Sequence, residues 1–147
     1  LDEETPYRLY EPGERNAALA GFAEEIQRFL AVPSGTILVA EEEDGRLVGY
    51  LQAIGRPQAR LRHVVSINVG ILQSHTGRGL GAELFTFLEE WARTAGVHRL
   101  DLSVMTTNPR ALKLYQKLGF AREGVKRRSM LVGGEYVDEI LMAKWLG

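Results

Sequence analysis

Gln73-Ser-His-Thr-Gly77-Arg78-Gly79-Leu80-Gly81-Ala82 is the stretch that says most about the fold of this chain. It follows a segment of alternating apolar residues, 63–72, and precedes a strongly amphipathic segment, 79–95. The pattern therefore predicts a strand, a glycine-rich loop and a helix. Glycines let the backbone approach a ligand closely, and free N–H groups at a helix N-terminus attract phosphates. Because Arg78 adds a cation, we interpret the stretch as a phosphate-binding loop.

Other interpretations of this loop can be weighed. A P-loop needs Gly-Lys followed by Ser or Thr, which the stretch lacks. A dinucleotide-binding fingerprint fits Gly77-x-Gly79-x-x-Ala82 formally, with Asp101 about 20 residues further on. It is disfavoured because 73–76 separate the first glycine from the strand, and because Asp101 begins the next predicted strand instead of ending it. A third interpretation is that the glycines serve only tight packing.

Outward from the loop, the pattern predicts an α/β fold with one mixed sheet. Helices are expected at 14–30, 79–95 and 108–118, and strands at 36–41, 47–54, 63–72, 99–106, 121–131 and 136–145. Segment 56–62 is expected to be a loop. The first helix should bury Leu19, Phe22, Ile26, Phe29 and Leu30, and the second should bury Leu80, Leu84, Phe87, Leu88 and Trp91. Gly70 inside its strand predicts a bulge or a close approach of another backbone segment.

Composition limits the classes of protein that the chain can represent. Its 147 residues suit one domain, 1–147, and 45% hydrophobic with 25% charged residues is ordinary for a globular protein. The absence of cysteine excludes disulfides and thiol nucleophiles within the chain. The three histidines lack metal-ligand spacing, and no apolar run reaches the roughly 20 residues of a membrane span. We therefore expect no metal, no membrane and a cytoplasmic location.

The net charge of −1 hides an uneven distribution. Residues 1–50 hold 4 basic and 11 acidic residues, a balance of −7, whereas 51–147 hold 14 and 8, a balance of +6. Nucleic-acid binders are more often basic overall, so we expect no nucleic-acid partner. The pattern favours one anionic and one cationic ligand, and charges that merely solvate the surface would give the same pattern.

A second motif is Asn108-Pro-Arg-Ala111-Leu-Lys-Leu-Tyr115-Gln-Lys-Leu-Gly119-Phe120. With the loop, it resembles the signatures of the GCN5-related N-acetyltransferase (GNAT) family, Arg/Gln-x-x-Gly-x-Gly/Ala and Asn-x-x-Ala-x-x-Leu-Tyr-x-x-x-Gly-Phe. Thr76 departs from the usual Arg or Gln. Segment 123–142 resembles the branch that acetylates small amines, amino acids and some protein N-termini. The resemblance covers 14–147 and implies a mostly antiparallel mixed sheet flanked by helices, without the family's first strand.

The resemblance implies an acetyl-CoA-dependent N-acetyltransferase acting on a small-molecule amine or a peptide N-terminus, and it is compatible with a homodimer. Tyr115 would be the general acid, because the matching Tyr has that role in relatives with this motif. A phenol of pKa ~10 lies close enough to a thiol that titrates near ~8.5 to donate a proton as the thiolate leaves. The residues that would bind acetyl-CoA are Val69, Ile71, Gly77, Arg78, Gly79, Leu80, Gly81, Ala82 and Asn108. A non-catalytic acetyl-CoA-binding module is the alternative function.

Several of these residues also have structural explanations. Val69, Ile71 and Tyr115 suit core packing, and Asn108 before Pro109 is a good helix N-cap. Arg110, Lys113 and Lys117 form a basic stripe that either meets the cofactor or solvates its helix.

The sequence does not identify the general base. The candidates are Asp101, Asp138, Glu139 and His63, each of which also has a structural explanation. A chain of water molecules leading to bulk solvent is the alternative for an amine of modest pKa. In the family, the first helices and the last hairpin frame the acceptor cleft, so Glu24, Glu25, Asp138 and Glu139 would give it negative potential. That would favour a cationic acceptor, unless these charges only face solvent.

Overall fold

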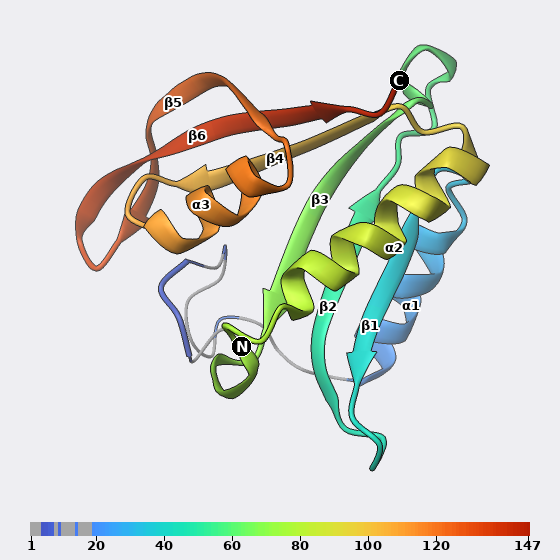
Figure 1. The fold of residues 1–147 in the computed structure, drawn as a ribbon, viewed down its shortest axis with the longest axis horizontal. Coiled ribbons are helices and arrows are strands. Elements are labelled where there is room, and N and C mark those ends of the chain that lie inside the picture. The colour runs from blue at the N-terminus through green and yellow to red at the C-terminus, as the bar shows by residue number, and fades with distance from the viewer. Residues whose placement is uncertain (1–3, 8, 10–13, 15–18) are drawn as a thin grey trace.

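The computed structural model describes residues 4–7, 9, 14 and 19–147. Within this part of the chain, six strands form one sheet in the order β1-β2-β3-β4-β6-β5. The strands are β1 (Thr36–Glu41), β2 (Leu47–Ile54), β3 (Val64–Ile71), β4 (Arg99–Met105), β5 (Ala121–Val132) and β6 (Glu135–Trp145). The helices are α1 (Leu19–Leu30), α2 (Leu80–Ala95) and α3 (Pro109–Lys117), with short 3-10 turns at Ala59–Leu61 and Gln73–His75. The predicted mixed α/β fold is confirmed (Figure 1).

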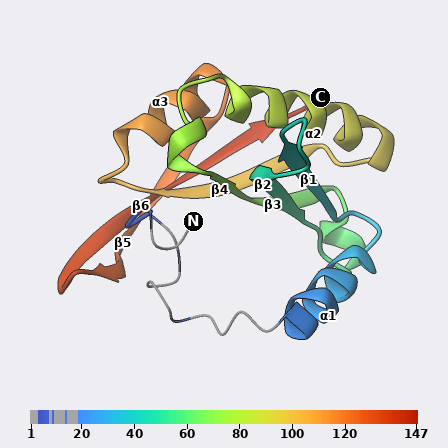
Figure 2. The same ribbon diagram turned by 90° about the horizontal axis from the view of Figure 1, so that it is seen from below.

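The sheet has two differently covered faces, because α2 and α3 lie over one and α1 lies on the side of the other (Figure 2). We call the first the core face. Its largest fully buried side chains come from the strands and α2 and include Leu51, Phe85, Leu88, Leu100 and Met142. Side chains alternate along a strand, so the residues between the core positions point to the opposite face, which we call the second face.

The point that positions the site is where β3 and β4 part. These strands are parallel and pair through Val64–Arg99, Val65–Leu100 and Ser66–Asp101. Beyond Ser66, β3 continues beside β2 as far as Ile71, and β4 continues beside β6 as far as Met105. The two strands therefore diverge as in a letter V, visible in Figure 1, and we call this divergence the splay.

This topology settles two expectations about the strands. The dinucleotide-binding interpretation is wrong, because β3 has an antiparallel neighbour, β2, and β4 has an antiparallel neighbour, β6. The bulge expected at Gly70 is also wrong. The β2–β3 register runs without a shift through the pairs Leu51–Val69, Tyr50–Gly70 and Gly49–Ile71. Near Gly70, β3 is separated from β4 because β3 continues beside β2 while β4 continues beside β6.

The helix faces required further corrections. Phe87 was expected to be buried but is 59% exposed, whereas its neighbour Phe85 is fully buried. The buried stripe of α2 is centred on Phe85, Leu88 and Ala92. Successive residues of a helix are about 100° apart around its axis, so Phe87 lies about 100° from Leu88 and outside the buried stripe. In α1, Ile26 and Leu30 are also exposed, because the helix packs chiefly along the edge strand β1.

Some expectations for the first helix lie outside the described residues. The predicted start at residue 14 cannot be followed through 15–18, and the described helix begins at Leu19. The side chains of residues 19–22, which include the expected core positions Leu19 and Phe22, are likewise outside the description. The predicted loop 56–62 contains the 3-10 turn Ala59–Leu61.

Candidate active site

The glycine-rich loop folds so that the first turn of α2 is open to a ligand. Gly77 and Gly79 adopt φ values of 76° and 85°, which favour glycine strongly, and Gly79 is the N-cap of α2. A glycine cap has no side chain that could accept a hydrogen bond from the first-turn N–H groups. The N–H groups at Leu80, Gly81 and Ala82 therefore combine with the helix dipole into a site suited to an anion.

The loop meets α3 and the end of β3. A Cβ placed on Gly77 would lie 2.9 Å from Nη2 of Arg110. A Cβ on Gly81 would lie 3.1 Å from Cδ2 of Leu114 and 3.6 Å from Cδ1 of Ile71. The fold thus brings together the two sequence motifs and the diverging end of β3. It also places the Arg110 guanidinium beside the loop, a position that the helical spacing of the basic stripe alone did not reveal.

Asn108 holds the start of α3 and keeps a donor free. Its Oδ1 accepts a hydrogen bond of 3.2 Å from the N–H of Ala111, which confirms the predicted N-cap. Its Nδ2 has no hydrogen-bond partner among the described residues. The capping role and a ligand contact are therefore compatible, since they use different atoms of one amide.

Tyr115 is part of the aromatic core. It is 7% exposed, and its ring lies 5.8 Å from the ring of Phe85 and 5.9 Å from that of Phe120. The structural role is confirmed. Val69 and Ile71 likewise pack against the core from β3, on the arm of the splay that runs toward the loop.

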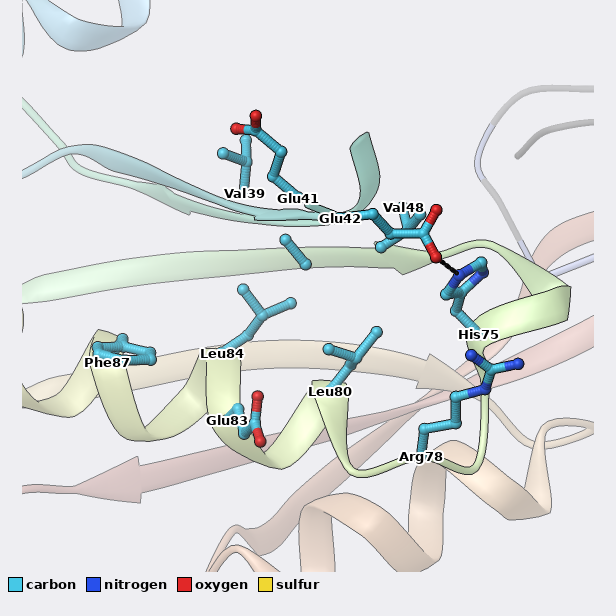
Figure 3. Close-up of a pocket in the computed structure, with 11 residues that line it drawn as sticks. Val39, Glu41, Glu42, Val48, His75, Arg78, Leu80, Glu83, Leu84 and Phe87 are labelled. Carbon is cyan, nitrogen blue, oxygen red and sulfur yellow. Dashed lines mark hydrogen bonds and ion pairs between the residues drawn. The ribbon is translucent and has the colours of Figure 1, made fainter. Parts of the chain in front are cut away.

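Arg78 and Leu80 line a depression of about 390 Å³ on the flank of α2 that faces β1 and β2 (Figure 3). The figure shows the Arg78 side chain on the side of His75. His75 is buried, with Nε2 2.7 Å from Oε1 of Glu42 and Nδ1 2.7 Å from Oγ of Ser74. These contacts tie the β1–β2 hairpin to the segment before the loop. The Arg78 side chain therefore lies on the flank of α2 that faces β1 and β2.

Thr76, the departure from the family signature, closes the turn that precedes the loop. Its Oγ1 donates a hydrogen bond of 2.8 Å to the carbonyl of Gln73. A threonine here shapes the loop locally, and the first-turn N–H groups of α2 do not depend on its side chain.

Carboxylates on the second face differ in their partners. Arg99 lies between two of them, with Nε 2.7 Å from Oδ1 of Asp101 and Nη1 2.9 Å from Oε1 of Glu123. Burial raises the pKa of Asp101 in spite of the arginine, whereas the hydrogen bond from Arg99 lowers the pKa of Glu123. Asp138 accepts a 2.7 Å hydrogen bond from the N–H of Arg128. Glu123 thus connects β5 to β4, and Asp138 connects β6 to β5, whereas Asp101 contacts an arginine of its own strand.

Glu139 has a different kind of partner. The hydroxyl of Ser103 on β4 donates a hydrogen bond of 2.7 Å to its Oε1. The two residues are 36 positions apart, so no local spacing could have revealed the pair. The remaining candidate base, His63, stands just before β3 with its ring 6.4 Å from that of Trp145.

The described residues show neither a metal-binding cluster nor a membrane-spanning helix. In residues 4–7, 9, 14 and 19–147, no three or more His, Asp or Glu side chains are grouped to hold a metal ion. None of the helices described above has the length and apolar character needed to cross a membrane.

Known proteins resemble this chain in sequence and in fold. The "Acetyltransferase (GNAT) family" model matches residues 3–120. The L-amino acid N-acetyltransferase AaaT of Escherichia coli is 32% identical over 105 residues, which are 69% of this chain and 63% of that protein. The N-alpha-acetyltransferase RimI of Mycobacterium tuberculosis is 37% identical over 98 residues, 65% of this chain and 59% of the relative. The matches thus span less than two thirds of each relative.

The solved structures agree. A GNAT-family acetyltransferase from Streptococcus pneumoniae superposes with a TM-score of 0.91 at 26% identity, covering 99% of this chain and 87% of the other. The family model extends over far more than half of the chain and includes the loop and α3. This chain belongs to the GNAT family of acetyltransferases.

Proposed function

We propose that the chain is an acetyl-CoA-dependent N-acetyltransferase that acetylates a primary amine. The observation that carries the proposal is the convergence of the uncapped first turn of α2, the Arg110 guanidinium and the diverging end of β3. Acetyl-CoA is the acetyl donor of this family. Its phosphates match an anion site of N–H groups and an arginine, so the residues present suit this donor.

The proposal gives each predicted ligand contact a specific role. The backbone of Gly77, Arg78, Gly79, Leu80, Gly81 and Ala82 would bind the pyrophosphate, with Arg110 adding charge. Asn108 would donate from Nδ2 to a carbonyl of the pantetheine arm. Val69 and Ile71 would contact the same arm along β3, since they lie where that strand leaves β4.

The chemistry follows from the residues that border the splay. Acetyl-CoA supplies an acetyl group activated as a thioester. The chain has no cysteine that could carry the acetyl group, so we propose direct attack by the amine in a ternary complex. Tyr115 would protonate the departing sulfur as the C–S bond breaks. A phenol titrates near ~10 and a thiol near ~8.5, so the transfer is uphill by only about 1.5 pKa units, and the phenolate regains its proton from solvent.

The acceptor is a primary amine, either free or at a peptide N-terminus. AaaT is named an L-amino acid N-acetyltransferase, and RimI is named an N-alpha-acetyltransferase. Both names fit an α-amine as the acceptor. We further propose a cytoplasmic protein with no nucleic-acid partner, on the strength of its charge pattern and its lack of cysteine. A homodimer stays a prediction.

The test has two stages, binding and then turnover. A saturating ligand at 100 times its Kd stabilises a protein by about 2.7 kcal/mol, so acetyl-CoA should raise Tm by several degrees and NAD should not. Thiol release is then measured with L-amino acids, a peptide with a free N-terminus, a cationic diamine and a neutral monoamine. Stabilisation without thiol release from any amine would favour the non-catalytic acetyl-CoA-binding module. No stabilisation would contradict the assigned site.

A further inference from the structure

Polar side chains line both arms of the splay on the second face. On β3, Val65 and Ile67 pack into the core, so Ser66 and Asn68 point the other way. On β4, Leu100, Leu102 and Val104 belong to the core, so Asp101 and Ser103 also point to the second face. Ser103 is the first second-face residue of β4 beyond the last β3–β4 pair, Ser66–Asp101. It therefore stands where the gap between the strands opens.

Glu139 reaches this same point from the neighbouring strand β6. The Ser103 hydroxyl fixes its Oε1 at 2.7 Å, and Glu139 is half-buried. No other side-chain hydrogen bond or ion pair of Glu139 is found in the part of the chain that the structure describes. Lys126 stands opposite Glu139 in the β5–β6 register but forms no ion pair of 4.0 Å or less with it there. Oε2 of Glu139 is thus left for another partner.

The other two candidate acids, Asp101 and Asp138, already contact arginine residues. Asp101 lies 2.7 Å from the Arg99 guanidinium. Asp138 is bonded to the backbone of Arg128, where β5 carries an irregularity between Lys126 and Met130, and lies 3.4 Å from the Arg127 guanidinium. Both carboxylates are thus already engaged with arginine residues of the sheet. Glu139 differs because its partner is a neutral hydroxyl.

We propose that Glu139 is the general base for the acceptor amine and that Ser103 is its positioning residue. This inference rests on the proposed function. Oε2 of Glu139 takes one proton from the ammonium nitrogen, whose freed lone pair forms the bond to the acetyl carbon. The C–S bond breaks, and sulfur takes the Tyr115 proton. Loss of the second amine proton to water and exchange of protons with solvent at Glu139 and Tyr115 complete the cycle.

The proposed acid and base belong to opposite faces of the sheet. Tyr115 packs into the core under α3, whereas Glu139 and Ser103 lie on the second face. Between them, β3 and β4 are no longer paired with each other. In the proposed arrangement the amine approaches from the second face and the donor is held on the side of α2 and α3, so that nitrogen and sulfur lie on opposite sides of the acetyl carbon.

The experiment compares Glu139→Gln, Ser103→Ala and the matched control Glu135→Gln on the same strand. Turnover is measured with primary amines of similar size whose pKa falls from that of a lysine-type amine, ~10.4, to that of a peptide α-amine, ~7.7–8.0. Glu139→Gln should lower kcat by roughly 10²-fold for the most basic amine and by less as the amine pKa falls. Ser103→Ala should give the same trend more weakly, with partial recovery in Ser103→Thr. Glu135→Gln should match the wild type.

The control measurement is the rise in Tm with acetyl-CoA, which should be unchanged in every variant. An equal loss for all amines, an unchanged rate in Glu139→Gln, or loss of the acetyl-CoA response would overturn the assignment of Glu139. If Glu139→Gln fails to fold, the pKa trend in Ser103→Ala decides, because Ser103 is exposed and its truncation is mild. A wild-type protein that acetylates no amine would instead overturn the proposed function itself.

Discussion

The ring of Tyr115 belongs to the aromatic core that α2 and α3 share, in contact with Phe85 and Phe120. Ring and hydroxyl can have separate roles, because packing depends on the ring area and proton transfer on one oxygen. The same division of roles occurs at Asn108, whose Oδ1 caps α3 while Nδ2 stays available.

At the residue scale we predict that Tyr115→Phe separates packing from catalysis. The variant keeps the ring contacts, so Tm and the acetyl-CoA response should stay close to those of the wild type. If Tyr115 protonates sulfur, kcat should fall by roughly 10²-fold or more. Steady-state thiol release and thermal melts provide the two readouts. Full turnover in Tyr115→Phe would leave the residue with its core role alone.

At the element scale, the N-terminus of α2 is distinctive because its cap has no side chain. α3, in contrast, is capped by Asn108. A ligand thus has a reason to bind at α2, where the first-turn N–H groups lack a side-chain acceptor. Gly81 is a poor place to test this, since a Cβ there would press on Leu114 at 3.1 Å and disturb packing whether or not a ligand binds.

Gly79 provides the clean test, with Gly134 as its control. Their φ values are 85° and 84°, and a Cβ at either position would meet nothing within 4 Å. Alanine in this backbone region costs about 1 kcal/mol, so Gly79→Ala and Gly134→Ala should lose similar stability. Only Gly79→Ala should weaken acetyl-CoA binding, by about tenfold, because its methyl group would occupy the anion site. Calorimetric titration measures this. Equal affinities in the two variants would argue against the pyrophosphate assignment.

At the scale of the whole molecule, a group of charged side chains from β4 and β5 lies where β3 and β4 are still paired. Arg99 on β4 contacts Asp101 on the same strand and Glu123 on β5, and Ser66 of β3 is paired with Asp101. The two carboxylates respond to pH in opposite directions, because the pKa of Asp101 is raised by burial and that of Glu123 is lowered by its hydrogen bond to Arg99.

These shifts predict opposite effects on stability in mild acid. Because the pKa of Asp101 is raised in the folded state, its contribution to the free energy of unfolding falls as pH rises from the ordinary pKa of 3.8 toward the folded value. Asp101→Asn should therefore gain stability relative to the wild type as pH rises through that window. The lowered pKa of Glu123 gives a contribution that is present above 4.5 and lost as pH falls. Glu123→Gln should therefore become less stable relative to the wild type as pH rises.

Urea unfolding of the three proteins from about pH 3.5 to 6 measures these slopes. If the stability of both variants relative to the wild type changes with pH in the same direction, the opposite pKa shifts of Asp101 and Glu123 are contradicted. The prediction concerns stability alone and is independent of the proposed acetyl transfer.

Local pattern was sufficient to predict much of this molecule. The strand boundaries, the glycine-rich turn into α2 and the Asn108 cap were all predicted from residues within a few positions of one another. Helix and strand periods, glycine conformations and caps are set by short-range geometry, so a single sequence reveals them. The two motifs also indicated the family, because both lie within short, ordered segments.

Tertiary structure decided what depends on distant partners. The sequence placed Gly70 in a bulge and Phe87 in the core, whereas the register with β2 and the orientation of α2 place them otherwise. It named Glu139 among several acids, and only the pairing of β4 with β6 sets that carboxylate beside Ser103 at the opening of the splay. Strand order and register bring these groups together across 36 positions, and such contacts leave no periodic trace in the chain.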